Sequence, residues 1–154
     1  MKKKIMISVF FLGFALCAFA QEEKMSAGLG LEWNMNSKHN FAGGANLGFY
    51  YNLPGYVALG FTVTGSTNFS GFHVIEPTAL LRYYFLEEGY ERFFIQIDTG
   101  PFIILEDGET RYKLEGGCRV GYRLPLNSSI YVEPYGRLGY PFAFGLGVMA
   151  GMYF

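Results

Sequence analysis

The sequence predicts an all-β fold, and three observations carry that prediction. From Met25 to Phe154, apolar and polar residues alternate with a period of two rather than the 3.6-residue period of an amphipathic helix. Eight alternating segments follow one another, separated by turn sequences such as Leu53-Pro54-Gly55. One side of the eight segments carries no charged residue, whereas the other side carries acids and bases. Such a pattern is typical of a sheet that separates two different environments.

Composition excludes several classes of protein. The chain has 154 residues, of which 51% are hydrophobic and 16% charged, so it is too apolar for a disordered protein and too small for two ordinary domains. Its net charge of −1 gives no indication of a nucleic-acid partner. Two cysteines exclude a disulfide-rich scaffold and a cysteine-based metal cluster. We therefore expect no metal and no cofactor.

The first 20 residues predict a cleavable signal peptide. Three lysines, Lys2 to Lys4, precede an apolar stretch that is too short for a membrane helix. Ala18-Phe19-Ala20 then places small residues at the two positions that a signal peptidase reads. We expect an exported chain with one folded domain, residues 21–154.

The first four segments alternate in the same way. Residues 25–34 place alanine, leucine and tryptophan on one side and serine, glycine and glutamate on the other. Residues 44–53 set alanine, leucine, phenylalanine and tyrosine against glycine and asparagine. Residues 57–64 oppose valine, leucine and phenylalanine to glycine and threonine, and residues 74–85 oppose isoleucine, leucine and tyrosine to glutamate, threonine and arginine. Each segment is predicted to be a strand with one apolar face.

The last four segments continue the pattern. Residues 92–103 set phenylalanine and isoleucine against arginine, glutamine and aspartate, and residues 111–124 set tyrosine, leucine, cysteine and valine against arginine, lysine and glutamate. Residues 130–140 oppose isoleucine, valine and leucine to tyrosine, glutamate and arginine. Residues 142–154 oppose phenylalanine, leucine, valine and methionine to glycine, alanine and tyrosine. These segments leave no residues for a helix or a second domain.

Connections and prolines complete the segment map. Compact turns at 53–55, 86–91 and 125–128 alternate with connections that contain 36–40, 65–71, 106–109 and the neighbourhood of Pro141. Asp107-Gly108 is the sequence of a hairpin turn. Pro77, Pro101 and Pro134 fall inside segments, where each removes a hydrogen-bond donor. We predict that they mark β-bulges at which the alternation slips by one residue.

The apolar face is predicted to contact lipid. Its side chains, many of them aromatic, exceed what an eight-stranded lumen holds, while the polar face is rich in glycine, as a crowded interior would be. Segments of mostly about 10–13 residues match tilted membrane strands. Outward aromatic residues near segment ends resemble the girdles at the two membrane interfaces. These interface candidates are Trp33, Tyr51, Tyr83, Phe85, Phe93, Tyr112, Tyr122 and Tyr140.

The predicted fold is therefore an eight-stranded antiparallel up-and-down transmembrane β-barrel, with both termini and the compact turns on the periplasmic side. A soluble secreted or periplasmic β-barrel that binds a small hydrophobic ligand is the alternative, because it also has one apolar face.

The C-terminus carries a family resemblance. Leu146-x-Val148-x-Ala150-x-Met152-x-Phe154 resembles the terminal signature of bacterial outer-membrane barrels, with Met152 where an aromatic is common. The chain is similar to the small eight-stranded class that includes the OmpA membrane domain, OmpX and OmpW. This resemblance implies an outer-membrane location and recognition of the terminal Phe154 by the barrel-assembly machinery. It also implies a porin-like role in the manner of OmpW, with a narrow passage for small solutes.

The inward charges are the candidate functional residues. They concentrate in the fourth to seventh segments, whereas the eighth, first and second present glycines. We predict that arginines and tyrosines cross the lumen towards this glycine wall, where buried charges must pair. A closed ion-pair plug and a narrow polar path are both consistent with these residues. The candidates are Glu76, Arg82, Asp98, Glu115, Arg119, Glu133 and Arg137.

Catalysis has little support in the sequence. An outer-membrane lipid hydrolase would use serine and histidine near the membrane surface, and Ser70 lies close to His73 without a recognised motif. His39 lies in a connection, and Cys118 is expected to act as a small apolar residue on the lipid face. We expect a non-enzymatic outer-membrane barrel with a structural or surface-interaction role.

Overall fold

The computed structural model describes residues 25–35, 41–53, 56–85, 92–106 and 109–154, and their side chains except those of Arg92 and Glu115. The predicted signal peptide (1–20), the connections at 36–40 and 86–91, His39 and the Asp107-Gly108 turn lie outside the described residues. Among the described residues, no helix is long and apolar enough to cross a membrane.

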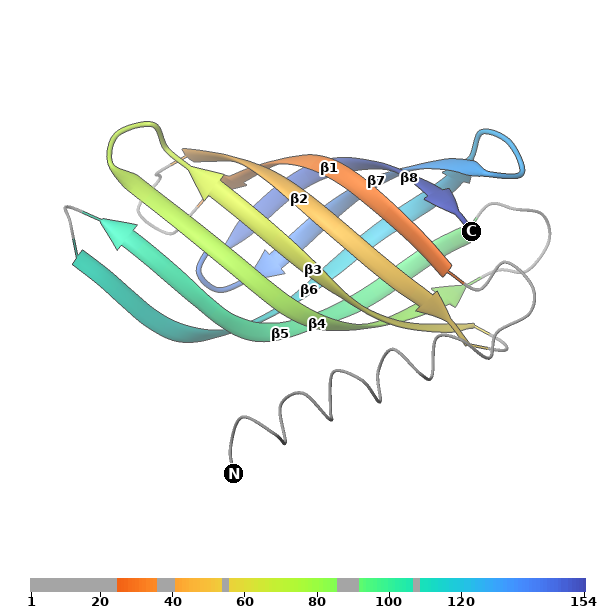
Figure 1. Cartoon of the computed structure of the whole chain (residues 1–154), viewed down its shortest axis with the longest axis horizontal. Coiled ribbons are helices and arrows are strands. Elements are labelled where there is room, and N and C mark those ends of the chain that lie inside the picture. Colours follow the sequence, from red (N-terminus) through yellow and green to blue (C-terminus); the bar gives the residue numbers. More distant parts are fainter. Residues whose placement is uncertain (1–24, 36–40, 54–55, 86–91, 107–108) are drawn as a thin grey trace, which may run out of the picture.

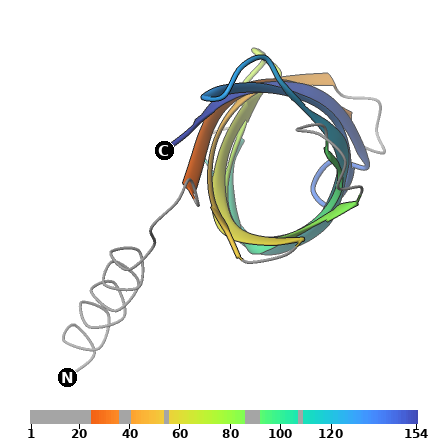
Figure 2. The same ribbon diagram turned by 90° about the vertical axis from the view of Figure 1, so that its right-hand side faces the viewer.

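Eight antiparallel strands close into one barrel, as Figures 1 and 2 show. The strands are β1 Met25–Met35, β2 Phe41–Asn52, β3 Val57–Thr67, β4 Phe72–Phe85, β5 Arg92–Glu106, β6 Glu109–Pro125, β7 Ile130–Gly139 and β8 Phe144–Tyr153. Each strand pairs with its neighbours in sequence, and β1 pairs with β8. The predicted up-and-down barrel of eight strands is confirmed.

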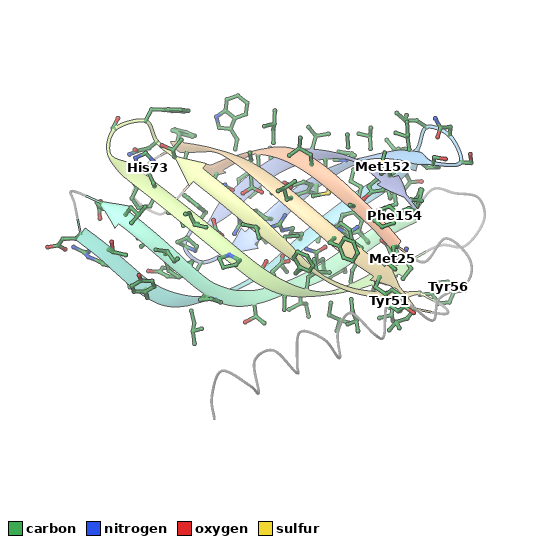
Figure 3. All side chains as sticks on the ribbon, viewed as in Figure 1. Met25, Tyr51, Tyr56, His73, Met152 and Phe154 are labelled. Carbon is green, nitrogen blue, oxygen red and sulfur yellow. The ribbon has the colours of Figure 1, made fainter. Side chains whose placement is uncertain are left out.

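The barrel closes between the first and last strands. The β1–β8 ladder runs from Ser26 opposite Tyr153 to Met35 opposite Phe144. Beyond it, the Met25 backbone N–H donates to the Phe154 oxygen at 3.2 Å, and the Phe154 N–H donates to the Met25 oxygen at 2.9 Å. We call the end of the barrel that holds Met25 and Phe154 the proximal end. The opposite end, which holds the β3–β4 turn, is the distal end. Figure 3 labels Phe154 near the proximal end and His73 near the distal end.

The predicted alternation is preserved in the strands. In β1, Leu29, Leu31 and Trp33 are 61%, 67% and 73% exposed on the outer wall, whereas the intervening Glu32 is 3% exposed inside. The outer wall is therefore apolar and the lumen holds the charges, because side chains alternate across each strand.

Several predictions near the strand ends are wrong. Residues 65–67, expected in a connection, belong to β3, since Gly65 pairs with Ala45 and Ile75, so the turn shrinks to 68–71. Phe142, expected on the outer face of the last strand, lies before β8 and is buried. Lys113, expected inside, is exposed because β7 pairs with β6 only from Gly117 onward and leaves the distal part of β6 uncovered.

The predicted bulges are also wrong. Pairing of β4 with β5 stops after Ile75↔Ile103 and resumes at Ala79↔Thr99 in the same register, and this places Pro77 directly opposite Pro101. Pairing of β6 with β7 likewise keeps one register across Pro134. Each proline removes a ladder donor, so pairing is lost locally while no residue is inserted.

Candidate functional site in the barrel lumen

The lumen is filled in layers. A proximal apolar cluster contains Tyr50, Ala58, Leu80, Tyr84, Phe94, Tyr135 and Met149. A distal one contains Ala42, Val74, Phe102, Ile104 and Phe142, with Phe72 packed against it. Charged side chains occupy the space between and beside these clusters. The following contacts trace them from the distal to the proximal end.

Glu32 of β1 is the hub of the distal half. Its Oε1 accepts hydrogen bonds from Arg137 Nη1 at 2.9 Å and from Asn34 Nδ2 at 2.6 Å. Its Oε2 accepts from Asn46 Nδ2 at 3.0 Å and from the Tyr135 hydroxyl at 2.9 Å. Four donors on β1, β2 and β7 thus converge on one buried carboxylate and satisfy its charge.

Arg137 joins two walls of the barrel. Its Nη2 lies 2.7 Å from Glu76 Oε2 while its Nη1 holds Glu32. Because β7 is adjacent to neither β4 nor β1, this side chain spans the lumen. The Phe142 ring lies 5.9 Å from its guanidinium on the distal side.

Asp98 and Gln96 of β5 connect the two halves. Arg119 Nε donates to Asp98 Oδ2 at 3.1 Å, and Arg119 Nη1 lies 3.9 Å from Glu32 Oε2. Gln96 donates through Nε2 to Asp98 Oδ1 at 2.6 Å and accepts at Oε1 from Arg82 Nε at 2.8 Å. Gln96 therefore links the distal charges to the proximal ones.

The proximal half centres on Glu133. Its Oε1 accepts from Arg82 Nη1 at 2.7 Å and from Arg123 Nε. The Arg82 guanidinium lies 3.8 Å from the centre of the Phe94 ring, and that of Arg123 lies 3.9 Å from the Tyr131 ring. Aromatic faces attract these cations where little water is present.

The network is neutral and shielded from solvent. Its side chains form one chain of contacts: Glu76, Arg137, Glu32, Arg119, Asp98, Gln96, Arg82, Glu133 and Arg123. Within the described part of the barrel, four acids and four arginines are buried, and each is between 1% and 5% exposed. Charges this deeply buried are tolerated only when they are paired, and here they are.

Glycines of β8 leave space for the large side chains of β7. Gly145, Gly147 and Gly151 stand directly opposite Arg137, Tyr135 and Tyr131. A Cβ atom on any of the three would collide with the side chain opposite it. The arginine and tyrosine side chains over these glycines therefore come from the adjacent strand β7, and not from across the lumen as predicted.

The structure places six of the seven candidates in this network. These are Glu76, Arg82, Asp98, Arg119, Glu133 and Arg137, while the side chain of Glu115 lies outside the described residues. Sequence reasoning left out the hub Glu32, the terminal Arg123 and the link Gln96. All three sit on the polar side of the predicted alternation, but nothing in the sequence singles out a hub.

Seven of the eight interface candidates occupy outward strand positions, in two groups. Trp33 and Tyr112 are near the distal end. Tyr140, predicted on the outer face, follows β7 at that end and packs its ring 5.2 Å from that of the buried Phe102. Tyr51, Tyr83, Phe85, Phe93 and Tyr122 are near the proximal end, where Tyr83 packs edge-on against Phe85 and Phe85 against Phe93. Leucine, isoleucine and valine occupy most of the wall between the groups.

The described residues with catalytic potential, Ser70, His73 and Cys118, are not assembled into a site. The Ser70 hydroxyl hydrogen-bonds to the Asn68 carbonyl within its own turn, and His73 is exposed on the outer wall. Cys118 is a free, half-buried thiol on the same wall. Within the described ranges, no group of three or more histidine, cysteine or acidic residues could hold a metal ion.

Sequence comparisons do not assign a family. No protein-family model matches the chain, and no curated protein matches it.

Solved structures share its fold. Neisserial surface protein A has a TM-score of 0.63 at 11% identity, over 84% of this chain and 94% of that one. The N-terminal β-barrel domain of Pseudomonas aeruginosa OprF gives 0.60 at 12% identity, over 84% and 97%. A de novo designed transmembrane β-barrel gives 0.59 at 7% identity, over 88% and 98%. The chain thus has the fold of the small eight-stranded outer-membrane barrels, which the sequence predicted.

Proposed function

We propose that this protein is an integral outer-membrane barrel with a sealed lumen, which acts as a non-enzymatic scaffold for its distal surface rather than as a channel. The observation that carries this proposal is the burial of the lumen charges: side chains that lined a water-filled pore would be exposed, yet all eight are between 1% and 5% exposed. One apolar cluster packs among the proximal charges and another lies at the distal end, and both support a closed interior.

The outer wall supports the membrane location. Large apolar side chains remain exposed around the barrel, among them Leu47 at 60%, Leu59 at 45% and Ile97 at 58%. A soluble protein rarely exposes so continuous an apolar surface, whereas lipid covers it in a membrane barrel. The two groups of aromatic residues are expected to lie at the two membrane interfaces.

The distal end offers the surface for interaction. The β5–β6 hairpin continues past the point where β7 ends, and its residues Glu109 to Leu114 are exposed. Arg111 pairs with Glu109 at 2.7 Å on this extension, and Lys113 donates to the Tyr140 hydroxyl at 3.0 Å. With a sealed lumen, this hairpin and the neighbouring connections are where a surface partner would bind.

Single-channel recording tests the sealed lumen. The protein refolded into a planar lipid bilayer is expected to leave the current of the bare bilayer unchanged. Insertion is verified on the same preparation by the β-sheet signal in circular dichroism and by the altered mobility of the unheated protein in gel electrophoresis. Discrete current steps that change in size with Arg119→Ala or Arg137→Ala would reject the scaffold in favour of a narrow solute path.

A further inference from the structure

Three aromatic side chains form an exposed patch on the outer wall at the distal end. Trp33 is 73% exposed, Phe41 is 65% exposed, and Phe69 of the β3–β4 turn is 86% exposed. Trp33 and Phe41 occupy outward positions in β1 and β2, so their exposure follows from the strand pattern. Phe69 lies outside the strands, and its exposure therefore needs a separate explanation.

Phe69 is held in a backbone conformation that suits it poorly. Its φ is 59°, in the left-handed region that bulky side chains avoid and that glycine and asparagine tolerate. The turn is nevertheless well defined: the Phe69 N–H donates to Thr67 Oγ1 at 3.0 Å, and the Asn68 side chain accepts from the Ser70 and Phe72 N–H groups at 2.9 and 3.1 Å. A strained, exposed phenylalanine gains nothing from the protein interior that would offset its strain.

The Phe69 ring folds back along the outer wall. A Cβ atom on Gly43 would lie 3.8 Å from Phe69 Cε2, so the ring reaches the level of that glycine. Gly43 occupies an outward position directly opposite Trp33 on one side and Thr67 on the other. A separation of 3.8 Å from that added atom is ordinary van der Waals contact, so the Phe69 ring lies against the outer wall at Gly43, whose neighbour across the ladder is Trp33. The patch is therefore continuous with the apolar band of the barrel.

We propose that the turn Asn68–Gly71 is a membrane anchor that inserts Phe69 into the headgroup–acyl boundary of the outer leaflet, beside Trp33 and Phe41. Aromatic rings favour this boundary, and lipid contact would offset the cost of the left-handed backbone. The β3–β4 turn then rests on the membrane surface. The inference depends on the proposed membrane location and assigns lipid as the partner of a turn that strand alternation alone would leave in water.

A single-tryptophan experiment locates the turn directly. The chain has one tryptophan, Trp33, so the double variant Trp33→Phe/Phe69→Trp carries its only indole in the turn. In phosphatidylcholine vesicles with brominated acyl chains, we expect strong quenching of this indole by bromines placed near the headgroup and weak quenching by aqueous acrylamide. Efficient acrylamide quenching without bromine quenching would overturn the proposal.

Two controls separate this proposal from the membrane location. Wild-type protein reports on Trp33 in the barrel wall, and bromine quenching there shows that the barrel is inserted whatever the indole in the turn reports. The variant Trp33→Phe/Glu109→Trp places the indole on the exposed β5–β6 extension, where we expect acrylamide quenching instead. If wild-type Trp33 escapes bromine quenching, the proposed membrane location fails, and the anchor fails with it.

A stability measurement distinguishes anchoring from a role in shaping the turn. Phe69→Asn places a residue that tolerates a positive φ in the same turn. If Phe69 anchors the turn in lipid, the urea midpoint of the variant in vesicles is equal to or below that of wild type, because the lost lipid contact offsets the relief of backbone strain. A higher midpoint would mean that no contact between the ring and lipid compensates for the strain, and would refute the anchor.

Discussion

At the scale of single residues, sequence reasoning identified the awkward positions but not how they are accommodated. Pro77 and Pro101 were expected to create bulges, yet they face each other across an interrupted ladder in an unchanged register. That arrangement depends on how β4 is aligned with β5, which no local pattern reveals. Gly100, next to Pro101, keeps the two strands close at this point, because a Cβ atom there would collide with the Pro77 carbonyl oxygen.

Gly100→Ala is therefore expected to push β4 away from β5. We expect a loss of about 1–3 kcal/mol, the usual cost of forcing extra atoms into a packed site. Gly65→Ala is the matched control, since nothing lies within 4 Å of a Cβ atom at that position. Urea titrations of both variants in vesicles provide the comparison, and equal midpoints would show that the strand seam does not depend on Gly100.

The hub of the network makes a second residue-scale prediction. Glu32→Gln removes the charge that Arg137 and Arg119 share, and breaking a buried pair of this kind costs about 3–5 kcal/mol. Glu109→Gln removes the partner of Arg111 in an exposed pair, where the expected change is within about 1 kcal/mol. Unfolding free energies of the two variants in vesicles test this contrast. Similar losses of unfolding free energy in the two variants would mean that burial does not determine how much an ion pair stabilises the barrel.

At the scale of elements, period-two alternation predicted which side of each strand faces the lumen, because side-chain direction is a local property. Strand ends were predicted less well. Gly43 falls just before the predicted second segment and Gly65 in a predicted connection, but in the barrel each pairs with residues of both neighbouring strands. Phe142 fits the alternation of the last strand, yet the chain reaches β8 only after placing this ring inside the distal mouth, where it meets Phe72. Such differences come from contacts between strands.

The relation between β7 and β8 is testable at this scale. Gly147→Ala would place a methyl group where the Tyr135 ring lies, and the displaced tyrosine would weaken its hydrogen bond to Glu32. Gly136→Ala is the control on β7, because its Cβ atom would meet neighbours at an ordinary 3.8 Å. We expect faster amide exchange in β7 and β8 for the first variant alone. Unchanged exchange in both would show that the glycine wall is not needed to seat Tyr135.

At the scale of the whole molecule, the sequence indicated a charged interior but could not indicate which charges pair. Arg137 reaches Glu76 and Glu32 across the lumen, and these contacts exist only once eight strands have closed with one particular stagger. The neutrality of the lumen also depends on barrel closure, because each buried acid pairs with an arginine from a different strand. We therefore expect that closure of the barrel, pairing of the buried charges and exclusion of water from the lumen occur together during folding.

A membrane barrel and a soluble barrel differ in what contacts the apolar outer wall: lipid in the first and water in the second. Ile97 is 58% exposed on the outer wall between the two aromatic groups, and Leu114 is 79% exposed near the distal end. For a barrel in lipid, Ile97→Arg should cost about 2–4 kcal/mol and Leu114→Arg about 0–1 kcal/mol, because the penalty for a charge depends on its depth in the bilayer. For a soluble barrel, neither arginine would matter, since both would stay in water. Unfolding free energies in vesicles give the answer. A cost confined to Ile97→Arg places the apolar wall in lipid, whereas two harmless substitutions would show that this wall never meets the bilayer core.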